Sequence, residues 1–89
     1  MDVTNNRADR RFELMTDAGP AIAAYAMEGD AIVFTHTVVP REAEGHGVGS
    51  RLIAGALTQV RAEGLKVVPQ CAFVRAYLER HPAWQELLA

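Results

Sequence analysis

The residues best placed to do chemistry are three glycines that alternate with other residues in one short loop. The segment Glu44-Gly-His-Gly-Val-Gly49 follows an apolar run that ends at Pro40 and precedes a stretch of helical period. Residues without Cβ let a ligand approach the backbone closely, and the first turn of a helix offers unpaired N–H groups whose dipole favours negative charge. We therefore predict an anion-binding loop, with a pyrophosphate-bearing ligand as the first hypothesis.

Two common glycine patterns do not describe this loop. A P-loop has Lys and then Ser or Thr directly after its last glycine, whereas Gly49 is followed by Ser50-Arg51. A dinucleotide fingerprint lies in the first strand–helix turn of a longer doubly wound sheet. Here the loop comes after three predicted strands, and too little chain follows it for such a sheet.

Two further side chains are candidates for reactivity. Cys71 follows Pro69 at the carboxyl end of the last predicted strand, the edge at which α/β proteins bind ligands, and a nearby helix N-terminus would favour its thiolate. A buried, inert cysteine is the alternative. His36 could accept a proton near neutral pH, or it could be a hydrogen-bonded core histidine.

The spacing of apolar residues predicts the strands and helices that would position these residues. Arg11–Met15 alternates as a half-buried strand, and Ala21–Met27 between two turns favours a strand, with a helix as the alternative. Residues 31–39 form the clearest strand, rich in β-branched and aromatic residues. Strict alternation places Ile32, Phe34, His36 and Val38 on one face of it, and the apolar content of both faces predicts a strand covered on both sides.

The period changes after the glycine loop. A single apolar stripe predicts a helix from about Gly49 to Glu63, ended by Gly64. Leu65–Val68 is a short strand, which a right-handed crossover would place parallel to the preceding strand. Cys71–Arg80 has helical spacing, and Pro82 could open a final helical turn.

We therefore predict one α/β domain over residues 1–89, with residues 1–9 as a loose leader. Its mixed sheet would have about four strands, three antiparallel and one parallel, with a crossover helix and one or two C-terminal helices. The 89 residues are 49% hydrophobic and 22% charged, which indicates a globular chain.

Composition also limits the classes of binding partner and the cellular compartment that we expect. A formal net charge of −2 gives no basic footprint for nucleic acid. No apolar run approaches the roughly 20 residues of a membrane span, and the first ten residues lack a signal peptide's apolar segment, so we expect a soluble cytoplasmic protein. A single cysteine excludes an internal disulfide, and the three histidines lack paired ligand spacing, so no metal site is predicted.

The loop and its flanks resemble the GCN5-related N-acetyltransferase superfamily. The acyl-CoA loop of that superfamily reads Gln or Arg, two residues, Gly, one residue, then Gly or Ala; Gly47 and Gly49 match, whereas Glu44 departs from the pattern. The chain is similar to the very short YjdJ-type members from His36-Thr-Val-Val-Pro40 through Val67-Val-Pro-Gln-Cys71 to Arg80-His-Pro82. This similarity covers about half of the chain.

The resemblance implies acetyl-CoA as the ligand, with its pantetheine arm in a V-shaped opening between two parallel strands. It implies that main-chain groups of Val38 and Val39 pair with the arm or the thioester. It implies that the N–H groups of Gly45, His46, Gly47, Val48, Gly49 and Ser50 hold the pyrophosphate, beside Glu44. It also implies that Cys71 handles acetyl groups, and Tyr77 is a candidate for protonating the leaving thiolate, or else a packed tyrosine.

The function implied is acetyl-CoA-dependent N-acetylation of a primary amine, on a small molecule or a protein lysine. Direct transfer and a relay through Cys71 both remain open. The alternative is a CoA-binding module with little catalysis, because the chain lacks the helices with which larger relatives build an acceptor pocket. A structural or regulatory domain is a third possibility. A monomer and a small homo-oligomer are both compatible with the sequence.

Overall fold

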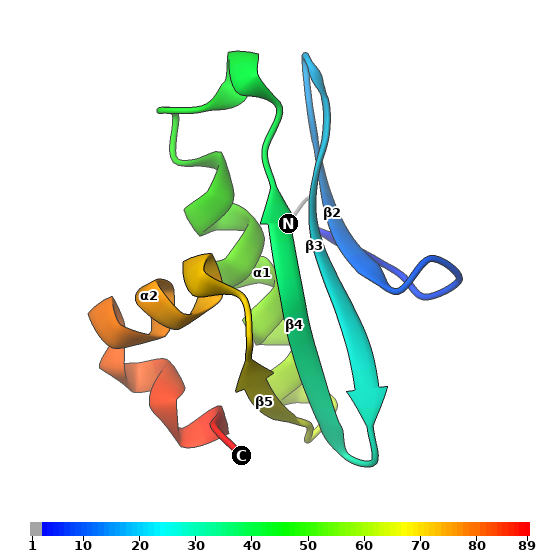
Figure 1. Cartoon of the computed structure of the whole chain (residues 1–89), viewed down its shortest axis with the longest axis vertical. Helices are drawn as coiled ribbons and strands as arrows, with labels where there is room; N and C mark the ends of the chain where they lie inside the picture. Colours follow the sequence, from blue (N-terminus) through cyan, green and yellow to red (C-terminus); the bar gives the residue numbers. More distant parts are fainter. Residues whose placement is uncertain (1–2) are drawn as a thin grey trace.

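In a computed structural model, residues 3–89 form a five-stranded sheet with two α-helices and two short 3-10 helices (Figure 1). The strands lie across the sheet in chain order: β1 (Thr4–Asn6), β2 (Arg11–Thr16), β3 (Gly19–Glu28), β4 (Ala31–Val38) and β5 (Lys66–Pro69). Neighbouring strands are antiparallel except β4 and β5, which are parallel. The predicted mixed α/β sheet is confirmed, with five strands instead of four.

The additional strand is β1, which lies within the predicted loose leader. Its three residues pair with β2, and Val3 just before it is buried. Val3 packs so closely on Gly55 of α1 (Val48–Ala62) that a Cβ there would overlap the Val3 side chain, and the Val3 carbonyl accepts a 2.8 Å hydrogen bond from Gln59 Nε2. The prediction of a loose leader is therefore wrong for residues 3–6, while residues 1 and 2 lie outside the described part.

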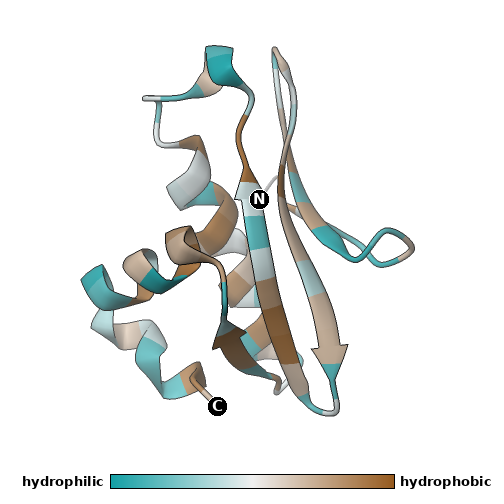
Figure 2. Ribbon diagram, in the orientation of Figure 1, coloured by the Kyte–Doolittle hydropathy of each residue, from teal (hydrophilic) through white to brown (hydrophobic). Residues whose placement is uncertain are grey.

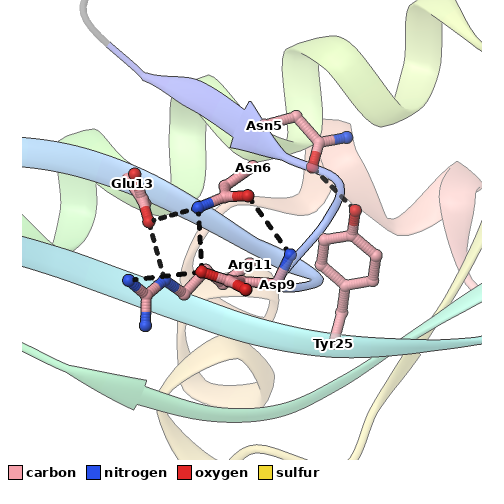
Figure 3. A network of polar contacts seen from close by, with 6 residues as sticks. All are labelled: Asn5, Asn6, Asp9, Arg11, Glu13 and Tyr25. Atoms are coloured by element: carbon pink, nitrogen blue, oxygen red, sulfur yellow. Dashed lines mark hydrogen bonds and ion pairs between the residues drawn. The ribbon is translucent and has the colours of Figure 1, made fainter.

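Polar side chains hold β1 onto the rest of the sheet (Figure 3). Asn6 Nδ2 donates to Glu13 Oε2 at 3.0 Å, and Arg11 Nε donates to the same oxygen at 2.6 Å. The bond from Asn6, and then the Arg11 guanidinium, lower the pKa of the Glu13 carboxyl. This short, polar strand is thus attached by side chains as much as by its backbone ladder.

The core lies between the sheet and the apolar stripe of α1. Leu52, Ile53, Ala56, Leu57 and Val60 are almost completely buried and pack with side chains of β2, β3 and β4. In Figure 1, α1 passes behind β4 and β5, and Figure 2 shows hydrophobic residues concentrated in β4, β5 and α1. The predicted helix and its stripe are confirmed to within about a residue at each end.

A bulge in β4 changes which side chains face this core. Ala24 of β3 pairs with His36 and Tyr25 pairs with Phe34, so Thr35 has no partner of its own in the register. His36 and Val38 are exposed, whereas Thr37 pairs with the buried Ala23. The prediction that His36 and Val38 share the face of Phe34 is therefore wrong, because the extra residue shifts the alternation by one.

The parallel strands β4 and β5 separate after a short contact. Their register ends at Phe34 and Pro69, and a last bond of 2.9 Å joins the Cys71 N–H to the Phe34 carbonyl. β4 continues for four more residues, while the chain after β5 turns into α2 (Ala72–Arg80) and then the 3-10 helix η2 (Pro82–Leu87). The opening between the two strands is the place for which a ligand was predicted.

Candidate functional site

Two glycines turn the chain from β4 into α1. After η1 (Arg41–Ala43), Gly45 has φ of 85° and Gly47 has φ of 73°, both in the left-handed region that residues with a Cβ disfavour. Gly47 is the N-cap of α1, and its carbonyl accepts the first helical bond, from the Arg51 N–H at 3.1 Å. The alternating glycines are thus explained by the backbone conformation of the loop.

The loop leaves a run of free donors. Among residues 3–89, the N–H groups of residues 45–50 have no hydrogen-bond partner in the protein, and no side chain caps α1. Such donors need water or a ligand acceptor, and at a helix start the dipole favours an anion. Six consecutive amides are therefore available to bind anionic oxygens.

A pocket of about 330 Å³ adjoins these amides. Its walls come from the end of β4, the glycine loop, the first turn of α1 and the start of α2; they are Thr37, Val39, Ala43, Glu44, Gly45, Gly47, Val48, Gly49, Ser50 and Phe73. Most of the predicted ligand-binding residues are thereby brought together. Val38 and His46 are the two that do not line this pocket.

Val38 and His46 lie on other surfaces. Val38 is 50% exposed on the opposite face of β4. His46 faces a wider hollow of about 750 Å³ on the far side of the loop, together with Arg51 and the tip of the β2–β3 hairpin. We assign the site to the smaller pocket, because it lies where β4 and β5 separate and contains the free amides.

Cys71 lies just behind the wall of this pocket. It is the N-cap residue of α2 and 7% exposed, and its Sγ atom is 3.3 Å from the Oγ1 atom of the pocket-lining Thr37. The thiol therefore lies at a helix N-terminus with a hydroxyl in contact with its sulfur atom. Thr37 was not predicted, and the sequence carries no signal for it, because regular alternation placed it on the other face.

The other two candidate catalytic residues lie outside the pocket lining. His36 is exposed on the opposite face of β4, with Nδ1 3.3 Å from Thr35 Oγ1. Tyr77 is buried in α2 and stacks on His81 at a centroid distance of 4.0 Å. Its hydroxyl makes no hydrogen bond to another residue of the described chain. Their catalytic roles stay predictions.

Comparison with known proteins identifies the family. The profile of the GCN5-related N-acetyl-transferase family matches residues 11–87, which is most of the chain. No curated protein matches. The NMR structure of a GCN5-like protein from Staphylococcus aureus has the same fold, with a TM-score of 0.75 and 24% identity over 98% of this chain and 86% of that one. The chain belongs to the GCN5-related N-acetyl-transferase family.

Proposed function

We propose that the protein is an acetyl-CoA-dependent N-acetyltransferase that acts on a primary amine of a small molecule or a protein lysine. The observation that carries the proposal is the run of free amides at residues 45–50, which borders a pocket at the separation of β4 and β5. These amides fit the oxygens of a diphosphate in number and type. Family membership supports the acyl-transfer chemistry.

In this proposal the ligand extends from the loop toward Thr37. The amides of residues 45–50 bind the diphosphate, Val39 lines the pantetheine arm, and the thioester lies near the Thr37–Cys71 pair. The exposed carbonyl and amide groups of β4 beyond Phe34 have no partner from β5, so they are free to hydrogen-bond the arm. The main chain thus supplies most of the binding.

Two routes of transfer use these residues differently. In direct transfer, the amine nitrogen attacks the thioester carbon, the C–S bond breaks, and the amine's proton passes to a base while the CoA thiolate is protonated. In the relay, the deprotonated Cys71 sulfur attacks the thioester carbon and the CoA thiolate leaves. The amine nitrogen then attacks the acetyl carbon on Cys71, loses a proton to a base and displaces the Cys71 sulfur. His36 as base and Tyr77 as proton donor are the expectations for direct transfer.

One observation favours the alternative of a CoA-binding module with little catalysis. None of the three candidate catalytic side chains lines the pocket, and Glu44 is its sole titratable lining residue. A binding site made of main-chain amides can hold CoA without activating an amine. The two functions therefore differ in turnover and not in affinity.

Two measurements test the proposal. Titration calorimetry with CoA tests binding, and release of free CoA thiol from acetyl-CoA in the presence of a panel of primary amines tests turnover. The enzyme requires binding and amine-dependent thiol release, with the acetylated amine found by mass spectrometry. Binding without release assigns the module, and absence of binding overturns both. Among residues 3–89, neither α-helix has the length and hydrophobicity of a membrane-spanning segment.

A further inference from the structure

The ring of Phe73 lies unusually close to the backbone of the glycine loop's helix. Phe73 is the second residue of α2, and a Cβ built on Gly49 would lie 2.6 Å from the ring's Cζ atom and 3.2 Å from both Cε atoms. The tip of the ring is therefore directed at the Gly49 Cα, in the first turn of α1. Only glycine at position 49 permits this approach.

This ring is also partly uncovered. Phe73 is 38% exposed, and it lines the pocket that contains the free amides. Its neighbours Cys71 and Val74 in the same chain turn are buried. An aromatic wall beside a few polar groups is the usual composition of a small-molecule site, where an apolar part of the ligand covers the ring.

The position of the ring indicates which part of a ligand it would contact. On one side lies Gly49, whose amide belongs to the diphosphate-binding run. Cys71, which contacts Thr37, lies two residues before Phe73 in the chain, at the N-cap of the same helix. A ligand that places its diphosphate on the amides and its thioester near Cys71 passes the ring with the segment between them.

We propose that Phe73 is a positioning residue for the pantetheine arm, and that Gly49 is glycine so that the ring can take this place. The inference rests on the proposed binding of CoA. The ring supports the mostly apolar arm and so fixes the distance between the diphosphate on the loop and the thioester at the Thr37–Cys71 pair. The ring does not contact the nucleotide.

Calorimetry with two probes tests this role. One is CoA, and the other is its 3′-phosphorylated ADP fragment, which has the nucleotide and diphosphate but no pantetheine arm. We expect Phe73→Ala to weaken CoA binding roughly tenfold, as the loss of a half-buried aromatic contact implies, and to leave fragment binding within about twofold of the wild type. Leu88→Ala is the matched control, because Leu88 is 39% exposed and lies outside the pocket, and it should change neither affinity.

The outcomes separate this inference from the function on which it rests. If the wild type binds neither probe, the proposed CoA site falls, and this inference falls with it. If the wild type binds CoA and Phe73→Ala binds it equally well, or loses both probes equally, only the role of Phe73 is overturned.

A second pair of variants covers the case in which Phe73→Ala does not fold. Gly49→Ala should weaken CoA binding, because its methyl group meets the tip of the Phe73 ring. Adding Phe73→Leu to Gly49→Ala should restore part of that loss, because leucine has no Cζ. Additive losses in the double variant would contradict the coupling of the two residues. Melting temperatures of all variants show which of them fold.

Discussion

The Cys71 Sγ atom and the Thr37 Oγ1 atom lie 3.3 Å apart across the point where β4 and β5 separate. Either atom could be the donor in this contact. Thr37 lines the pocket and Cys71 lies behind it at the N-cap of α2, so the pair connects the pocket to the protein's single thiol. The reactivity of that thiol is therefore expected to depend on the hydroxyl.

Thr37→Val tests this dependence. If the hydroxyl donates to the Cys71 sulfur as it reacts, its loss removes a hydrogen bond worth about 1 kcal/mol, and alkylation of Cys71 by iodoacetamide should slow roughly threefold to tenfold. Thr58→Val is the control, since its hydroxyl donates to the Ala54 carbonyl on the exposed side of α1. Equal alkylation rates in Thr37→Val and the wild type would show that the contact does not activate the thiol. Intact mass after incubation with acetyl-CoA shows whether Cys71 gains an acetyl group.

Glu44 places a carboxylate in the lining of the pocket, where a diphosphate would bring more negative charge. We expect Glu44→Gln to tighten CoA binding roughly twofold to fivefold at low ionic strength, and the gain should shrink as salt screens the repulsion. Calorimetry at two salt concentrations measures it. Glu79→Gln, on the exposed side of α2, is the control. A gain that is independent of salt would argue against an electrostatic cause.

Gly47 has a left-handed backbone at the start of α1, with open space where a Cβ would lie. Gly47→Ala should therefore cost about 1–2 kcal/mol of folding stability through backbone strain, and it should also weaken CoA binding by shifting the amides. Gly29→Ala is a matched control, because Gly29 has φ of 62° and open space too, but lies in the β3–β4 turn. Similar losses of melting temperature with different CoA affinities would support the loop as the site; equal affinities would contradict it.

Glu13 makes the attachment of β1 sensitive to acid. The hydrogen bond from Asn6 and the Arg11 ion pair lower the pKa of Glu13 in the folded state, so their stabilising effect is present above the unfolded pKa of about 4.3 and is lost as the pH falls through the folded pKa. We expect Glu13→Gln to be less stable than the wild type at neutral pH and to lose less stability in acid. Thermal melts from pH 7 down to about pH 3 measure this.

Glu28→Gln is the control for that experiment, since Glu28 ends β3 and contacts neither Asn6 nor Arg11 in the described structure. It should follow the wild-type pH profile. A Glu13→Gln profile parallel to that of the wild type would mean that the network contributes no pH dependence.

The sequence predicted those parts of the fold that repeat over many residues. The stripe of α1 and the long antiparallel strands are set by side chains that recur with a fixed period, and the loop is set by glycines whose backbone conformations need them. β1 was not predicted, because its three polar residues show no hydrophobic periodicity. Its attachment depends on the packing of Val3 against Gly55 and on the hydrogen bond from Asn6 to Glu13.

The candidate site was predicted less completely than the fold. Its loop residues were found, but Thr37 and Phe73 were missed because each depends on a contact between distant segments. Thr37 reaches Cys71 only because of the bulge, and Phe73 reaches Gly49 only because of how α2 packs on α1. A glycine at the start of the predicted helix was the one available signal for the second contact.

The bulge at Thr35 lets the two halves of β4 alternate their side chains independently, which a regular strand does not allow. From the Glu28–Ala31 end, β4 follows β3 in one register; beyond Thr35, it follows β3 in a register shifted by one residue. Removal of Thr35 would join the two halves into an uninterrupted ladder and still leave Thr37 directed inward, because Phe34 and Thr37 would then be two positions apart. The hairpin can therefore lose a residue here and keep the side chain that contacts the thiol on the core side.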